Sequence, residues 1–218
     1  MNICKRIRDY AWFVRSVAIR RRYRTVAQAP VTVVLVPGIF EGQSQLETLA
    51  QALNGLGYRI VHVPELKLQT APTSDLAQML LRRVAEINGP VILLAHSKGG
   101  LIGREVLTHR NELNQLVGMV AIATPWQGSS LARFFPHTSA VRRLAPQGSD
   151  IGVTPQPLDT DERIYSLIPA WDPHVPNGSY LPGAHNIRLS SAGHFLPLGT
   201  LETQRYVAEC IKHLLRAR

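Results

Sequence analysis

Apolar residues follow two alternating patterns from residue 31 to the end of the chain. Short, nearly continuous apolar runs predict buried strands, and the stretches between them repeat apolar residues every three or four positions, as amphipathic helices do. The predicted strands cover residues 31–36, 59–63, 91–95, 117–123, 164–169 and 186–189, and the predicted helices cover residues 43–56, 74–87, 97–109 and 198–215. Strands that alternate with helices form parallel sheets. We therefore expect an α/β fold, with a mostly parallel sheet of about six strands flanked by helices.

Two segments depart from this alternation. Residues 127–162 combine two short helical patterns, at 129–135 and 140–144, with a stretch rich in Gly, Pro and Asp. Irregular insertions between late strands often shape a binding site, so we interpret this one as lid-like, within a domain that covers residues 29–218. Residues 1–28 form a separate basic segment, which we expect to be an amphipathic helix.

The apolar residues of that helix form one stripe at helical spacing. They are Ile3, Ile7, Tyr10, Ala11, Val14, Val17 and Ala18. Two interpretations stay open: the stripe packs on the domain and covers a sheet edge, or the helix makes peripheral contact with an anionic membrane surface through residues 1–24. Its apolar run is too short for a transmembrane span. We recognise no secretory signal and expect a cytoplasmic protein, with membrane association and an organelle transit peptide as open alternatives.

Charge and motif content narrow the function classes. Residues 1–24 hold eight basic side chains against one acidic side chain, so +7 of the net charge of +9 belongs to the first segment. The rest of the chain has no basic face large enough to predict nucleic-acid binding. No zinc-protease, EF-hand or phosphate-loop motif occurs, and the two cysteines form no C-x-x-C pair. We therefore expect chemistry without a metal or another cofactor.

A serine stands where the strand at 91–95 turns into the helix at 97–109. In the run A-H-S-K-G-G over residues 95–100, small residues lie two positions before and two positions after Ser97. They let neighbouring backbones pass without a Cβ clash, so that the serine side chain is pushed out of the sheet on a sharp turn. This is how a nucleophile elbow is built, and Ser97 is the predicted catalytic nucleophile.

A serine nucleophile needs a histidine base at the same edge of the sheet. Among eight histidines His194 is the strongest candidate, because it follows the last predicted strand within a short Gly-containing loop. Ligands of open α/β sheets bind at this carboxyl edge, where Ser97 also emerges. His185 and His174 are the alternatives.

The histidine in turn needs an acid that fixes its tautomer. Asp172 follows the predicted strand at 164–169 within three residues and precedes His194 by 22 positions. Three other acids, Asp150, Asp159 and Asp161, fall in the insertion before that strand and fit this role less well. The resulting order along the chain is Ser, Asp, His, as in α/β-hydrolase triads.

Acyl transfer also needs N–H donors for the oxyanion. The backbone N–H of Lys98 follows the nucleophile directly, and a second donor is expected from the loop P-G-I-F over residues 37–40. We assign this second donor to Ile39, because Gly38 permits a close approach to the serine.

These motifs, together with T-P-W-Q-G-S over residues 124–129, resemble the α/β-hydrolase superfamily, and within it the small lipases and esterases. An alanine at the first position of the elbow also occurs in the small Bacillus-type lipases. The resemblance covers the chain from about residue 31 onward. It implies a minimal α/β-hydrolase fold that starts at the third strand, and hydrolysis of carboxylic esters through an acyl-enzyme with Ser97, Asp172 and His194 as the triad.

The expected substrate is a small-molecule acyl ester with a sizeable apolar group. Aromatic residues near the predicted site motivate this expectation, and we assign Phe40, Trp126 and Phe134 to substrate binding, with Phe135 close by. A thioesterase or an acyltransferase would use the same residues, because water and other acceptors reach one acyl-enzyme. A non-catalytic binding protein that keeps the hydrolase pocket is the alternative from another class. The sequence predicts no oligomeric state.

Overall fold

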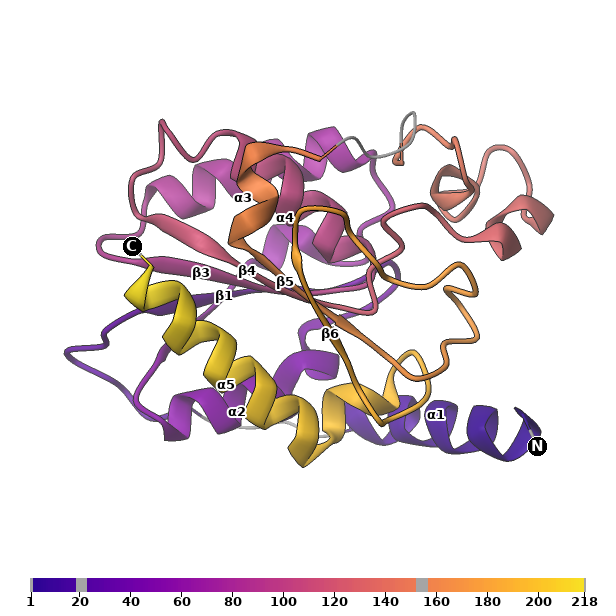
Figure 1. Cartoon of the computed structure of the whole chain (residues 1–218), viewed down its shortest axis with the longest axis horizontal. Coiled ribbons are helices and arrows are strands. Elements are labelled where there is room, and N and C mark those ends of the chain that lie inside the picture. Colours follow the sequence, from indigo (N-terminus) through magenta and orange to yellow (C-terminus); the bar gives the residue numbers. More distant parts are fainter. Residues whose placement is uncertain (1, 19–22, 152–156, 218) are drawn as a thin grey trace.

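The computed structural model describes residues 2–18, 23–151 and 157–217 (Figure 1). Its centre is a six-stranded sheet with the strand order β2-β1-β3-β4-β5-β6, in which every neighbouring pair is parallel. The strands are β1 (Thr32–Val36), β2 (Arg59–His62), β3 (Val91–His96), β4 (Leu116–Ile122), β5 (Ile164–Ile168) and β6 (His185–Arg188). The predicted α/β class and the six strands are thereby confirmed, with ends that differ by at most one residue.

Helices cover both faces of this sheet (Figure 1). They are α2 (Glu47–Gly55), α3 (Thr73–Ala85), α4 (Lys98–Thr108) and α5 (Leu201–Arg216). The helices predicted at 43–56 and 198–215 each begin with a separate 3₁₀ turn, η1 (Gln43–Leu46) and η6 (Leu196–Gly199). Pro197 lies in the second turn, and the side chain of Thr200 then caps α5 by accepting the Thr203 N–H.

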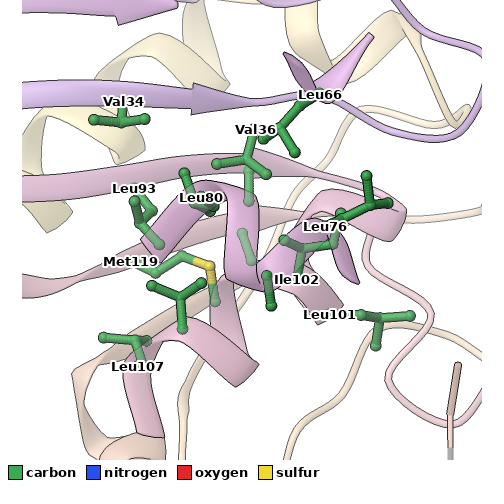
Figure 2. Packing of buried hydrophobic residues seen from close by; sticks show 14 of the residues in the cluster. Val34, Val36, Leu66, Leu76, Leu80, Leu93, Leu101, Ile102, Leu107 and Met119 are labelled. Carbon is green, nitrogen blue, oxygen red and sulfur yellow. The ribbon is translucent and has the colours of Figure 1, made fainter. Parts of the chain in front are cut away.

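The alternation of side chains along the strands builds two apolar cores, one on each face of the sheet. Val34 and Val36 of β1 face a core that α3 and α4 close with residues such as Leu80 and Ile102 (Figure 2). Side chains at the intervening positions of β1, such as Leu35, face a second core closed by α2 and α5. Because successive strand residues point to opposite faces, a strand buried on both sides must be apolar throughout. This explains the continuous apolar runs of the sequence.

The insertion at 127–162 contains no α-helix in the part that the structure describes. The two predicted helices are short 3₁₀ turns, η3 (Ser130–Phe134) and η4 (Arg142–Leu144), and a third turn, η5 (Asp159–Arg163), leads into β5. Prolines at 136 and 146 follow the first two turns and prevent them from continuing, because proline has no N–H to donate. The segment instead forms one wall of a pocket described below.

The N-terminal helix α1 (Asn2–Val17) packs on the domain with a face that the stripe does not predict. Asp9 and Ser16 are buried, Trp12 and Phe13 are half-buried, and the main neighbours of the helix are η1 and η6. The stripe itself is exposed, with exposed fractions of 73% for Ile3 and 69% for Val14. The interpretation in which the stripe packs on the domain is therefore wrong, because aromatic and hydrogen-bonding side chains beside it make the contact.

The turn between β3 and α4 has the geometry of a nucleophile elbow. Ser97 has a φ of 51° and a ψ of −124°, in a region that residues other than glycine rarely adopt. A Cβ on Gly99 would overlap the carbonyl oxygen of Val36, and one on Gly100 would overlap the side chain of Thr124. Both glycines are thus required for the close approach of β1 and β4 to this turn.

Replacing Gly99 with alanine should therefore destabilise the fold. The added methyl group meets backbone atoms that cannot rotate away, so we expect a loss of about 1–3 kcal/mol in the free energy of unfolding. Gly55→Ala in α2 is the matched control, because its Cβ would meet no atom within 4 Å, and it should be neutral or slightly stabilising. Urea unfolding of both variants measures the difference, and equal midpoints would contradict the close approach at Gly99.

Candidate active site

The three residues selected for a triad form one chain of hydrogen bonds. The Nε2 atom of His194 lies 3.0 Å from Ser97 Oγ, and its Nδ1 atom lies 2.7 Å from Asp172 Oδ2. Ser97 directly follows β3, Asp172 lies beyond β5 and His194 lies beyond β6, so the parallel sheet brings them to the same carboxyl edge. All three are buried. With Asp172 ionised, Nδ1 carries the proton and Nε2 is free to accept the one on Ser97.

The surroundings of Asp172 keep it ionised. Burial alone would raise the pKa of this carboxyl, but His194 and the backbone N–H groups of His174 and Val175 lower it below its usual value. Those N–H groups donate to Oδ1 at 2.7 and 3.0 Å. Because they occupy Oδ1, the other oxygen is the one that meets His194.

The imidazole of His194 is correspondingly more basic than a free histidine. Burial alone would lower its pKa, but the charge and hydrogen bond of Asp172 raise it above 6.5, with smaller contributions from Glu41 and Asp9. This raised basicity favours the transfer of the Ser97 proton to His194.

The alternative histidines are occupied differently. His174 lies beside His194, with ring centres 4.8 Å apart, and its Nε2 atom is 2.8 Å from the hydroxyl of Tyr10. Burial, and then repulsion from His194, lower the pKa of His174 to about 4, so it is neutral near pH 7. His185 lies on β6, where it stacks on Tyr165.

Two of the alternative acids also have partners elsewhere. Asp150 accepts from the Thr73 N–H and pairs with the side chain of Lys98 at 2.8 Å. Asp161 pairs with Arg104. Asp172 is the acid that the structure places on His194.

The loop that carries His194 is held by a carboxylate from α1. Asp9, whose side chain is fully buried, accepts the backbone N–H groups of His194, Phe195 and Leu196 at 2.9, 2.7 and 2.6 Å. Gly193 leaves room for this contact, because a Cβ there would overlap the carboxylate. Asp9 is not among the residues predicted from the sequence, although its position as the single acid in a segment with eight basic residues is a signal.

A second buried pair holds the same loop from the other side. The Nε2 atom of His96 donates to the carbonyl oxygen of His194 at 3.0 Å, and its Nδ1 atom lies 2.8 Å from the carboxyl of Glu41. Glu41 also accepts the Gly38 N–H at 2.8 Å and so ties the 37–40 loop to His96. Glu41, which is also not among the predicted residues, thus links two loops of the site.

Among the described residues, one group of side chains is close enough to hold a metal ion. It consists of Glu41, His96 and His194, whose possible ligand atoms lie within 4.8 Å of one another. Hydrogen bonds already engage these atoms: those of His194 face Ser97 and Asp172, and those of His96 face Glu41 and a carbonyl oxygen. The hydrogen-bond network therefore explains why these three side chains lie close together.

The residues predicted as oxyanion donors are Lys98, directly after the serine, and Ile39 in the 37–40 loop. Lys98 begins α4, and its side chain turns away to the Ala71 carbonyl oxygen and to Asp150. A Cβ on Gly38 would lie 2.9 Å from that of Ser97, which places the 37–40 loop against this serine. The N–H groups of Phe40 and Glu41 donate within the protein, whereas no acceptor among the described residues takes the N–H of Ile39.

A pocket of about 450 Å³ opens beside Ser97 and His194. Its walls come from α1, the 37–40 loop, the insertion and the loop after β5. They include Arg6, Tyr10, Phe13, Ile39, Phe40, Leu131, Phe135, Val141, Leu144 and Val175. Apolar side chains predominate, so the pocket suits an apolar group.

Of the three predicted substrate residues, Phe40 lines this pocket and the other two do not. Trp126 is 1% exposed and donates its indole N–H to Ser166 of β5 at 2.9 Å, so it belongs to the core. Phe134 is 85% exposed and points away, while its neighbour Phe135 and Leu131 line the pocket. The assignments of Trp126 and Phe134 are therefore corrected.

Comparison with solved structures identifies the fold of the chain. No family model matches the chain, and no curated protein matches its sequence. Solved structures do: the mature lipase BlEst2 of Bacillus licheniformis has a TM-score of 0.66 at 18% identity, covering 89% of this chain and 96% of its own. The chain has the α/β-hydrolase fold.

Further structures with this fold differ in the activity that they are named for. The metagenomic carboxyl esterase MGS0156 has a TM-score of 0.63 at 16% identity, over 92% of this chain and 80% of its own. The thioesterase RedJ of Streptomyces coelicolor has a TM-score of 0.57 at 18% identity, over 94% of this chain and 98% of its own. At these identities the comparison establishes the fold that the sequence resemblance implied.

Removing the carboxylate of Asp9 should destabilise the protein strongly. Asp9→Ala leaves three backbone N–H groups without this acceptor, two of them buried, and each buried group without a partner costs about 1–3 kcal/mol. We expect a loss of at least about 2 kcal/mol in urea unfolding. Asp9→Asn, which keeps one acceptor oxygen, should lose less.

Glu65→Ala is the control for this pair of variants. Glu65 is exposed and makes no hydrogen bond or ion pair among the described residues, so its loss should change stability by less than about 0.5 kcal/mol. Equal stability of Asp9→Ala and Glu65→Ala would show that Asp9 does not hold the loop.

Proposed function

We propose that the protein is a serine hydrolase that cleaves carboxylic esters through an acyl-enzyme on Ser97. The observation that carries this proposal is the buried hydrogen-bond chain from Ser97 through His194 to Asp172, at the edge of an apolar pocket. A serine at neutral pH becomes nucleophilic only when a base takes its proton, and this chain supplies the base and the acid that orients it.

The reaction follows from this arrangement in two halves. Ser97 Oγ attacks the ester carbonyl carbon while its proton passes to His194 Nε2, and Asp172 stabilises the resulting imidazolium. The N–H groups of Ile39 and Lys98 are the proposed donors to the oxyanion, each worth about 2.7–4 kcal/mol in the transition state. The tetrahedral adduct then collapses, the C–O bond to the alcohol breaks, and His194 protonates the departing alcohol. In the second half His194 takes a proton from water, and the water oxygen attacks the acyl carbon. The bond from this carbon to Ser97 Oγ then breaks, and His194 returns the proton to Oγ as the carboxylic acid leaves.

The pocket favours a small-molecule ester with an apolar acyl or alcohol group. Phe40, Leu131 and Phe135 provide its apolar walls, and Arg6 places one cationic side chain at its edge. A lipase, an esterase and a thioesterase occur among the structures with this fold, which supports ester or thioester cleavage as the class of reaction.

A thioesterase or an acyltransferase is the second candidate, because its acyl-enzyme would be the same. The observation that favours it is the likeness to RedJ, a thioesterase, over 94% of this chain. The discriminating measurement is kcat/KM for an oxygen ester and a thioester that share one acyl chain, each with water alone and with an added alcohol acceptor.

Ser97→Ala provides the direct test of the nucleophile. Wild-type protein should be labelled covalently by a fluorescent fluorophosphonate and should hydrolyse a p-nitrophenyl ester, whereas Ser97→Ala should do neither while keeping its melting temperature. Ser191→Ala, in the histidine loop but outside the hydrogen-bond chain, is the control and should keep both properties. Labelling that persists in Ser97→Ala would remove this residue from its role, and an unlabelled wild type would favour a non-catalytic binding protein.

The pH profile tests the partnership of His194 and Asp172. Only neutral His194 accepts a proton, so kcat/KM should fall as the pH drops through a midpoint above 6.5, the raised pKa of His194. Asp172→Asn removes the main contribution that raises this pKa, and burial then lowers it, so the midpoint should move to lower pH. Turnover should also drop by up to about 10⁴-fold, as in other triads.

The matched variant for this experiment is Asp150→Asn, which alters an acid that pairs with Lys98 instead. It should leave the midpoint in place. If Asp172→Asn keeps the wild-type pH profile while Asp150→Asn loses activity, the acid that orients His194 is Asp150, which lies in the insertion.

A further inference from the structure

The outward face of α1 has no partner among the described residues, although it is strongly apolar. The exposed fractions of Ile3, Ile7, Val14 and Val17 are 73%, 63%, 69% and 56%. The inward face fastens the helix through the hydrogen bonds of Asp9 and the packing of Phe13 on Phe195, with ring centres 4.6 Å apart. The orientation of the helix is thus fixed, and it holds the apolar stripe outward.

The charges exposed on this helix are all of one sign. Lys5, Arg6, Arg8 and Arg15 are exposed, while the single acid, Asp9, is buried under backbone N–H groups. The arginines at 20–22 lie outside the described residues and extend the same positive sequence. Exposed apolar residues among cations that lack counter-charges are typical of helices that lie in the surface of an anionic bilayer.

The stripe is continuous with the mouth of the pocket. Tyr10 belongs to the stripe and also lines the pocket, together with Phe40, Leu131 and Phe135, which are themselves 56%, 41% and 47% exposed. The described residues include fifteen large apolar side chains that are exposed, and nine of them belong to α1 or to the segments around this mouth. Apolar exposure is thus concentrated where substrate would enter.

We propose that α1 lays its outward stripe on an anionic phospholipid surface and so brings the mouth of the pocket to the lipid. A second copy of the chain fits this face less well, because a two-fold contact would press the same basic side chains against one another. In Figure 1, α1 (indigo) lies at the lower right beside the segment that precedes α5, and the opposite side of the helix is open. No helix among the described residues is long and apolar enough to cross a bilayer, so the contact proposed is peripheral.

The test is co-sedimentation of the full chain with vesicles of phosphatidylcholine containing phosphatidylserine, compared with phosphatidylcholine alone. Wild-type protein should bind the anionic vesicles, and binding should weaken in high salt. Lys5→Gln/Arg8→Gln/Arg15→Gln should weaken it by about five-fold for each charge removed. Ile3→Ser/Ile7→Ser/Val14→Ser should weaken it by about ten-fold or more.

Matched variants use exposed residues of the same types on other elements. Arg59→Gln/Arg82→Gln/Arg205→Gln removes three basic charges, and Leu56→Ser/Leu201→Ser removes two apolar side chains. Both should bind vesicles within about two-fold of wild type. All α1 variants should keep the wild-type melting temperature and the rate on a short, water-soluble ester, because none of the changed residues lines the pocket.

Three outcomes would overturn the proposal. Wild type that ignores anionic vesicles, or α1 variants that bind as well as wild type, would show that the stripe does not meet lipid. If light scattering shows that wild type is a dimer and that Ile3→Ser/Ile7→Ser/Val14→Ser is a monomer, the stripe is an interface between two copies of the chain. The proposal stands apart from the chemistry, because Ser97→Ala should bind vesicles like wild type even where hydrolysis is lost.

Discussion

The position of one imidazole, that of His194, is the constraint around which this structure is organised. A carboxylate and an imidazole removed from water lose their hydration, so the pair is stable only when each polar atom has another partner. Here the second oxygen of Asp172 takes two backbone N–H groups, and the backbone of His194 is held through its N–H by Asp9 and through its carbonyl oxygen by His96. The network draws on α1, the loop after β1, the end of β3 and the loops after β5 and β6. The sheet brings these segments to one edge, and the hydrogen bonds fix them there.

The sequence predicted the parts of this site that depend on local pattern and topology. Ser97 lies in a short motif between a strand and a helix, and Asp172 and His194 each follow a strand. The rule that parallel strands end at one edge therefore sufficed to group them. Asp9 and Glu41 escaped prediction for a physical reason. Their partners are the backbone of a loop 185 residues away and a histidine 55 residues away, and no spacing in the sequence records such contacts.

The errors in the pocket lining have a related cause. In regular helices and strands, the spacing of apolar residues tells which side of the element each residue occupies. The described part of the insertion contains only short 3₁₀ turns, which are too short for such a repeat to develop. Phe134 and Phe135 are adjacent, yet one points to solvent and the other into the pocket. Trp126 is large and aromatic like a substrate contact, but its indole N–H finds a hydroxyl on β5 and the ring becomes part of the core.

Helix α1 shows why amphipathicity predicts that a helix forms but not how it docks. An apolar stripe usually faces the protein core, because its burial stabilises the fold. Here the inward face contains a carboxylate, a serine and two aromatic rings, and the stripe stays exposed. Three charge-assisted hydrogen bonds to the loop of His194 set this orientation, and they can do so because each buried N–H would otherwise lack an acceptor. The helix thus contacts the loop that carries His194 with its inward face and leaves its outer surface exposed. One helix therefore presents an exposed apolar surface on one side and holds the loop of the proposed base on the other.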